Sequence, residues 1–133
     1  MIKNTLVVGF EFISAIVFSA PRGHFFGWFK KMFLRLLGAK IGKSVTFYPG
    51  IKLSPGTNLY LGDQVDLAWG VIITTRGKVH IGDRTLVGYN TLILSTNHLI
   101  PRVPESIFSA GHSFAPIHIG NDVWIGGNCT ILA

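Results

Sequence analysis

The stretch that decides the fold runs from residue 81 to residue 98: Ile-Gly-Asp-Arg-Thr-Leu, Val-Gly-Tyr-Asn-Thr-Leu, Ile-Leu-Ser-Thr-Asn-His. It divides into three units of six residues, and each unit opens with an aliphatic residue. The first two units place glycine second, and all three place a small or polar residue, Thr85, Thr91 or Asn97, fifth. The last unit ends on His98, so the repeat leads directly to a side chain that can transfer protons.

The same frame opens further sets of units at Ile41, Leu61 and Ile119. The sets at residues 41, 61 and 81 are spaced by about 20 residues, which is typical of stacked repeats. When the sets are aligned, three columns contain only large apolar residues: Ile41, Leu61, Ile81, Ile119; Phe47, Leu67, Val87, Ile125; Leu53, Ile73, Ile93, Ile131. Because one unit cannot bury its apolar residue alone, the units must stack. An antiparallel sandwich predicts period-two alternation and hairpins, and neither explains a six-residue frame.

Two features resemble the hexapeptide-repeat acyltransferases. One is the unit that ends in His98 before an irregular segment, and the other is the string Pro-Ile-His-Ile-Gly-Asn-Asp-Val-Trp-Ile-Gly at residues 116–126. The resemblance covers residues 41–133 and is closest to the branch of galactoside, maltose, xenobiotic and exopolysaccharide O-acetyltransferases. It implies an all-β fold, a left-handed parallel β-helix, which is an exception to the right-handed crossover rule. It also implies further coils after residue 133, so this domain is expected to be truncated at its C-terminus.

Residues 1–40 do not join the repeat and predict an N-terminal helical segment. The apolar run from Leu6 to Phe18 is shorter than the roughly 20 residues of a membrane span. Residues 25–37 predict an amphipathic helix with Lys30, Lys31 and Arg35 on one face. The opposite face is apolar: Phe25, Phe29, Met32, Phe33, Leu36 and Leu37. Residues 1–38 are expected either to cap the open end of the stack, to lie on an anionic membrane surface, or to do both.

The amino-acid composition limits which kinds of partner and which cellular compartment are expected. The formal net charge is +6, the sequence pI is near 9.8 and the mean hydropathy is +0.45. The basic residues lie beside an apolar run and form no recognition motif, so no nucleic-acid partner is expected. The single Cys129 suits a reducing compartment and a packing role. We therefore expect a cytoplasmic protein, for which peripheral association with the inner face of the membrane through residues 1–38 is one of the alternatives left open.

His98 lies at the base of an inserted loop at residues 99–116, and a loop of that length between repeats usually has a function. A neutral imidazole can take the proton of an attacking hydroxyl group. His98 matches the family's catalytic histidine, and the resemblance implies transfer of an acetyl group from acetyl-coenzyme A to a saccharide or similar acceptor. The reaction would proceed in a ternary complex, with His98 as the general base. Glu105 is a candidate for fixing the second ring nitrogen of His98.

The resemblance also predicts the walls of the site and its assembly. Trp124 matches a tryptophan that packs beside the family's active site, and Asn97 is expected to shape the loop. Trp69 stands in Leu-Ala-Trp, where galactoside and maltose acetyltransferases have an acceptor-binding asparagine, so the acceptor stays open. Trp69 could face a sugar ring or a neighbouring subunit. The family forms trimers with active sites between subunits, which implies a homotrimer.

The sequence raises two alternatives to acetyl transfer, a metal site and a scaffold function. His80, His112 and His118 raise the question of zinc, because γ-class carbonic anhydrases share this fold; the spacing does not match that family, so no metal is expected. The alternative function is that of a truncated, inactive β-helix that acts as a scaffold or binding protein. Turnover of acyl-coenzyme A distinguishes this alternative from an enzyme.

Overall fold

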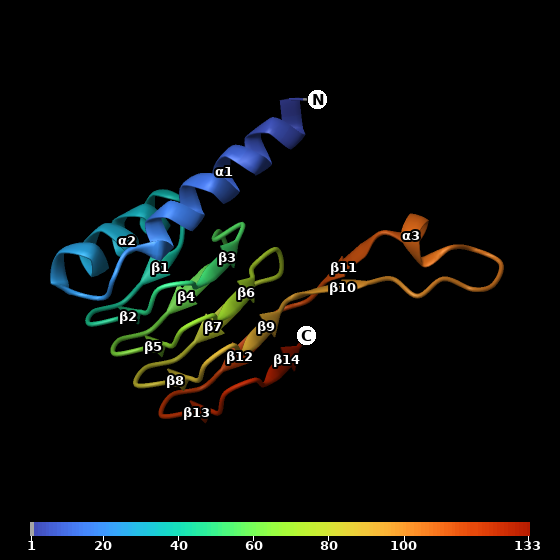
Figure 1. Cartoon of the computed structure of the whole chain (residues 1–133). Helices are drawn as coiled ribbons and strands as arrows, with labels where there is room; N and C mark the ends of the chain where they lie inside the picture. The colour runs from blue at the N-terminus through green and yellow to red at the C-terminus, as the bar shows by residue number, and fades with distance from the viewer. Residues whose placement is uncertain (1) are drawn as a thin grey trace.

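Two helices precede a series of short strands in the computed structural model, which describes residues 2–133 and the side chains of residues 7–133 (Figure 1). The helices are α1 (Ile2–Ser19) and α2 (His24–Leu36). Most strands then form three parallel sheets of four strands each. The first sheet contains β1 (Lys40–Ile41), β4 (Leu59–Leu61), β7 (Val79–Ile81) and β12 (Ile117–Ile119). The second contains β2 (Thr46–Phe47), β5 (Asp66–Leu67), β8 (Leu86–Val87) and β13 (Trp124–Ile125). The third contains β3 (Lys52–Ser54), β6 (Ile72–Thr74), β9 (Leu92–Leu94) and β14 (Thr130–Leu132).

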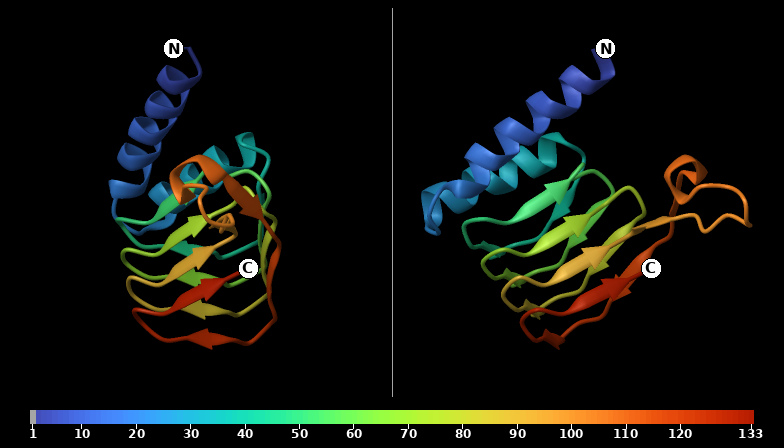
Figure 2. Two further views of the ribbon diagram at one scale, coloured as in Figure 1. Left: turned by 90° about the vertical axis from the view of Figure 1, so that its right-hand side faces the viewer. Right: turned by 45° about the vertical axis from the view of Figure 1, so that its right-hand side comes forward.

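The chain passes through the three sheets in turn, and one such passage is a coil. The coils span residues 40–54, 59–74, 79–94 and 117–132, and each pairs in parallel with its neighbours (Figure 2). The register pairs Ile41 with Leu61, Leu61 with Ile81, and Ile81 with Ile119. The other two predicted columns pair in the same way. The predicted parallel strands, their columns and the N-terminal helices are therefore confirmed.

The recurring glycine and the polar residue after it have a shared structural reason. The Oδ1 atom of Asn121 accepts a hydrogen bond of 2.8 Å from the backbone N–H of Asp83 in the coil below. Asp83 accepts in the same way from the N–H of Asp63, and Asp63 from the N–H of Lys43. A Cβ atom on Gly82 would collide with Asn121 Oδ1. Glycine is therefore required wherever this ladder of side chains passes close to the backbone.

Polar residues inside the stack are hydrogen-bonded, and they show where the third unit departs from the frame. The hydroxyl groups of Thr85 and Thr91 are buried and donate to backbone carbonyls of the last coil at 2.9 and 2.8 Å. In the third unit Ser95 is buried, whereas Asn97 is not. The chain leaves the coil immediately after Ser95, so Asn97 lies on β10 (Thr96–His98) and is not buried in the stack as Thr85 and Thr91 are.

The helix α2 covers the open end of the first coil, as the capping alternative predicted. Strand carbonyls of this coil have no further coil below to donate to them. Lys30 Nζ donates to Phe47 O at 3.2 Å and also to Ala20 O at 2.7 Å, while Arg35 Nη2 donates to Ile41 O at 2.6 Å. These cations replace the N–H donors of a missing coil, which satisfies carbonyls that would be costly to bury unpaired.

The sequence left open which face of α2 meets the coils. The structure buries Lys30 completely at the coils and turns Phe25, Phe29 and Leu36 outward. The reason lies in the carbonyls of the first coil, because they need donors that an apolar face cannot supply. In the part of the chain that the structure describes, no helix combines the length and apolarity that a membrane span requires.

Candidate active site

The chain leaves the stack after the third coil and forms an arm that projects sideways from it (Figures 1 and 2). The arm contains β10 (Thr96–His98), the short helix α3 (Ile107–Ala110) and β11 (His112–Phe114), and β10 pairs with β11 in antiparallel fashion. The sequence predicted an irregular loop at residues 99–116. Residues 112–114 of that loop instead form β11, which pairs with β10 immediately before the loop, so His98 lies on a paired strand and not at the end of a coil.

His98 is exposed on β10 and faces His112 on β11. The two residues are register partners, and their ring centroids are 4.3 Å apart with a tilt of 43°. Next to this pair, Leu99 N–H donates to Gly111 O at 3.1 Å, which continues the strand pairing towards the tip. From the sequence, His112 was expected to matter only as one of three histidines that could raise the question of zinc. The alternation His-Ser-Phe before Pro116 is the signal that could have shown a second strand.

The base of the arm is fixed to the coils by hydrogen bonds. Ser95 Oγ donates to Thr74 O and accepts from the backbone N–H of Gly77 at 3.1 Å. Ala115 N–H in turn donates to Ser95 O at 3.1 Å, so both strands of the arm are held at one point. Asn97 Nδ2 donates to Ala133 O at 3.1 Å. Asn97 therefore tethers the arm to the last coil, which gives the predicted role in shaping this segment a specific contact.

The structure does not bring the other predicted site residues to His98 within one chain. Glu105 is exposed on the arm, and the ion pair recorded in the described residues joins Arg84 to Asp122, so Glu105 makes no ion pair with His98 there. Trp124 lies on β13 of the second sheet and is 80% exposed. Trp69 follows β5 at the next corner and is 51% exposed.

His80 and His118 form a stack with Tyr60 on the first sheet. The centroid of the His80 ring lies 4.2 Å from that of Tyr60 and 4.3 Å from that of His118, and the three rings are nearly parallel. The approach of His80 and His118 predicted from their equivalent positions is confirmed, whereas His112 lies on the arm. Among residues 7–133, no three His, Cys, Asp or Glu side chains gather in a group that could hold a metal ion.

Cys129 lies in a corner of the last coil, where its backbone N–H donates to Thr91 Oγ1 at 3.3 Å. Its thiol is partly exposed and contacts Gly127 O at 3.7 Å. No histidine or cation lies among these contacts, so they offer nothing that would activate the thiol as a nucleophile.

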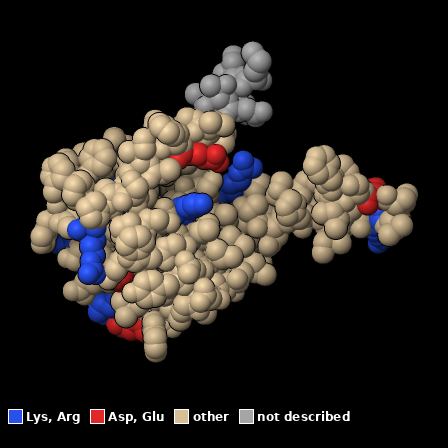
Figure 3. Space-filling model, in the orientation of Figure 1, with Lys and Arg blue, Asp and Glu red and all other residues tan. Residues whose placement is uncertain are grey.

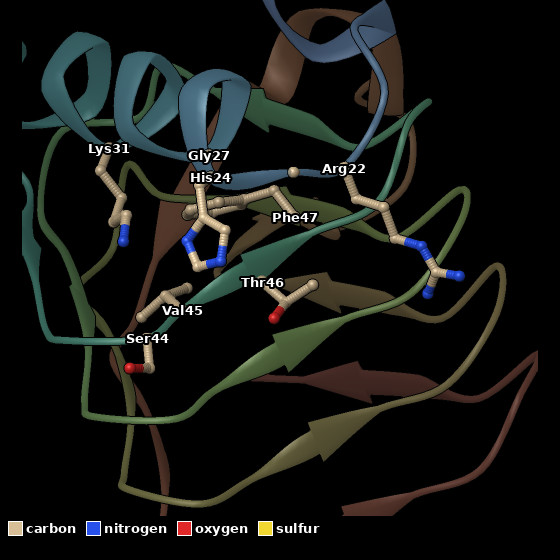
Figure 4. A pocket seen from close by; sticks show the side chains of 9 residues that line it. Arg22, His24, Gly27, Lys31, Ser44, Val45, Thr46 and Phe47 are labelled. Carbon is tan, nitrogen blue, oxygen red and sulfur yellow. The ribbon is translucent and has the colours of Figure 1, made fainter.

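Two pockets of about 400 Å³ lie between the N-terminal helices and the first coil. One is lined by α2 and β2 (Figure 4), and the other by α1 and β3. Neither pocket includes a residue of the arm. His98 itself is exposed in the single chain.

The chain is similar in sequence to several curated proteins. Nodulation protein L of Rhizobium meliloti (strain 1021) is 31% identical over 101 residues, which make up 76% of this chain and 54% of that protein. Galactoside O-acetyltransferase of Escherichia coli (strain K12) is 27% identical over 103 residues, or 77% of this chain and 49% of that enzyme. WcaF of the same strain, whose name assigns it provisionally to acetyl transfer in colanic acid biosynthesis, is 27% identical over 113 residues, 85% of this chain and 59% of that protein.

The matches cover most of this chain but only part of each relative. No protein-family model matches the chain, and no solved structure matches it. The chain spans about half the length of the curated relatives it matches. The similarity to WcaF is longer than the 93 residues from 41 to 133, so it extends into the helical segment. At modest identity over most of its length, this chain is a homologue of hexapeptide-repeat acetyltransferases.

Proposed function

We propose that the protein is an O-acetyltransferase that transfers an acetyl group from acetyl-coenzyme A to a hydroxyl group of a saccharide or similar acceptor. The observation that supports this most is the exposed position of His98 at the base of the arm, in a chain homologous to acetyltransferases. The names of two relatives refer to a galactoside and to colanic acid, which favours a saccharide acceptor. We place the reaction in the cytoplasm, a reducing compartment in which a lone cysteine is common.

His98 acts as the general base in this proposal. Its free ring nitrogen takes the proton of the acceptor hydroxyl while the oxygen attacks the thioester carbonyl carbon. The carbon–oxygen bond forms, and backbone N–H groups stabilise the negative charge on the former carbonyl oxygen. The intermediate then collapses, the carbon–sulfur bond breaks, and the departing thiolate takes the proton back from the imidazolium. The products are the acetyl ester and free coenzyme A, without an acyl-enzyme.

The group that positions His98 is His112 in this proposal, and not Glu105. A general base must be held in an orientation that directs its free ring nitrogen at the acceptor hydroxyl. The His112 ring lies 4.3 Å from the His98 ring on the paired strand, whereas Glu105 makes no ion pair with His98 in the described residues. An imidazole in contact can fix the orientation of its neighbour without adding a permanent charge.

We propose that residues 41–133 form the catalytic domain, a left-handed β-helix that works as a homotrimer, with residues 1–40 as its N-terminal segment. The arm exposes a set of large apolar side chains: Leu99, Ile100, Val103, Ile107, Phe108 and Phe114. A cluster of this kind on a projecting hairpin suits an interface with a neighbouring copy. The exposure of His98 supports the same idea, because a second subunit would complete the cleft.

A neighbouring copy would also give the two exposed tryptophans a role. Trp69 and Trp124 are both exposed on their own chain, so we propose that they line the cleft formed with the next subunit, with Asn97 holding the arm. Aromatic faces of this kind stack on the apolar face of a sugar ring.

The proposal is tested by incubating the protein with acetyl-coenzyme A and a panel of galactosides, glucosides and acidic oligosaccharides. Release of coenzyme A thiol that requires an acceptor, together with an acetyl ester found by mass spectrometry, is the expected result. If amines but no hydroxyl compounds are acetylated, the acceptor class is wrong. If no panel member reacts and acetyl-coenzyme A does not bind, the scaffold alternative holds instead.

A further inference from the structure

The two N-terminal helices turn a set of large apolar side chains away from the coils. This outer helical face consists of Val8, Phe12, Ile13, Ile16, Phe25, Trp28, Phe29, Met32 and Leu36. Each of these side chains is at least 43% exposed. Both helices lie at the N-terminal end of the stack, and α2 crosses the first coil (Figures 1 and 2). Exposed apolar side chains in this number exceed the scattered ones of an ordinary surface and indicate a contact with something else.

The inner side of α2 takes the place that a further coil below the first one would occupy. Lys30 and Arg35 already donate to carbonyls of the first coil, and Leu34 is fully buried against it. The outer helical face is thus not an unfinished part of the stack.

The distribution of charge distinguishes two possible partners of this face, a second copy of the chain and a lipid surface. Residues 1–60 contain eight Lys and Arg but a single acidic residue, Glu11, whereas residues 61–133 contain four basic and five acidic residues. Two copies joined through this face would bring together two regions of like charge, which is unfavourable. An anionic lipid surface attracts such a region and accepts apolar side chains at the same time. On the side of the molecule seen in Figure 3, charged side chains are sparse between broad uncharged areas.

Lys31 and Arg35 of α2 lie beside the outer helical face. At about 100° per residue, positions 24, 27, 31 and 35 form a strip between the buried positions and the outward apolar ones. Positions 24, 27 and 31 of this strip, together with Arg22, border a pocket of about 410 Å³ against the first coil, which Thr46 also lines (Figure 4). Arg22 is held in place because its Nη1 donates to Tyr48 Oη and its guanidinium lies over the Tyr48 ring at 4.7 Å.

We infer that this end of the molecule docks on an anionic lipid bilayer, with the outer helical face in the boundary between headgroups and acyl chains. Lys31 and Arg22, at the rim of the pocket, contact lipid phosphates. Insertion of apolar side chains supplies most of the binding, and the rim adds a preference for anionic lipid. This differs from the arrangement predicted from the sequence, because Lys30 is buried in the cap and takes no part. The inference does not depend on the catalytic proposal.

The test compares binding of the whole protein to phosphatidylcholine vesicles with and without phosphatidylglycerol, followed by flotation. The double variant Phe25→Ser/Phe29→Ser should bind anionic vesicles at least about tenfold more weakly, because two apolar side chains no longer enter the boundary. Lys31→Gln should weaken binding to the anionic vesicles but not to phosphatidylcholine alone. Matched controls are Tyr89→Ser, an exposed aromatic of the third coil, and Lys78→Gln, an exposed lysine just before that coil, and both should bind like the parent protein.

Tryptophan fluorescence gives a second, local readout. In vesicles with brominated lipid, a protein that retains only Trp28 should be quenched, whereas a protein that retains only Trp124 should not, since Trp124 lies on the last coil. Unfolding curves of each variant exclude loss of the fold. Equal quenching of the two tryptophans would overturn the inference. So would undiminished flotation of the helix double variant, or a change in its sedimenting mass without lipid, which would point to a second copy instead.

Discussion

The imidazole rings of His98 and His112 face one another across a two-stranded hairpin, with 4.3 Å between their centroids. Neither ring is part of the buried columns, and both lie on an arm that projects from the stack (Figure 1). A pair of proton-transferring groups on an exposed arm is therefore better explained by chemistry than by packing. The predictions on His98 and His112 follow from this pair.

Replacement of His98 by alanine should lower acetyl transfer by about 10² to 10⁴, the usual effect of removing a general base. The fold should be retained because the His98 side chain is exposed. Steady-state release of coenzyme A measures the loss, and Cys129→Ser is the control, since no thiol intermediate is proposed. A folded Cys129→Ser protein without activity, beside an active His98→Ala protein, would replace the ternary-complex mechanism with an acyl-cysteine pathway.

Replacement of His112 by alanine should reduce kcat by more than about tenfold and leave KM within a few fold, because a positioning group acts on the chemical step. His118→Ala, in the stack of the first sheet, is the matched control and should change neither kcat nor KM. An unchanged kcat in a folded His112→Ala protein would assign His112 to the structure of the hairpin alone.

The arm should hold the oligomer together. Phe108 is fully exposed in the single chain and Val103 nearly so. A contact between copies through the arm would bury both side chains. Sedimentation equilibrium should show a trimer for the parent protein and a smaller species for Val103→Ser/Phe108→Ser. Phe12→Ser, on the outer helical face, should leave the sedimenting mass unchanged. A parent protein that sediments as a stable monomer would contradict the trimer.

The columns were predictable from the sequence because inward positions recur at a fixed spacing and the burial of Ile81 or Leu67 depends only on that spacing. The orientation of α2 was not predictable in this way. Its outcome depends on which carbonyls of the first coil lack donors, such as those of Ile41 and Phe47, and no local pattern encodes them. The pairing of His98 with His112 was not predicted for a similar reason. The two residues lie 14 positions apart, and the segment that joins their strands has no repeat that would reveal the pairing.

The ladder of glycines gives a prediction about stability. Gly82→Ala should destabilise the protein by about 1–3 kcal/mol, because the added Cβ would be forced against Asn121 Oδ1 and the Gly120 backbone. Gly120 occupies the equivalent position in the last coil of this chain, and a Cβ there meets nothing within 4 Å. Gly120→Ala is therefore the matched control, with a change close to zero. Denaturant unfolding of both variants measures the difference, and equal midpoints would refute the role given to the ladder.

The cap at the first coil should be visible in the dependence of stability on pH. Desolvation lowers the pKa of buried Lys30 below its ordinary value of 10.5, so between the folded and unfolded pKa values the unfolded chain binds more protons at this position. Stability contributed by Lys30 therefore rises with pH through that window, and the cost of burying the charge is greatest below it. The neutral amine still has two hydrogens, enough for the carbonyls of Ala20 and Phe47. Lys30→Met should remove this rise and cost about 1–3 kcal/mol through the unpaired carbonyls, whereas Lys31→Met should do neither. Urea unfolding from neutral to alkaline pH measures both, and a wild-type curve parallel to that of Lys30→Met would show that the buried amine does not titrate as the cap requires.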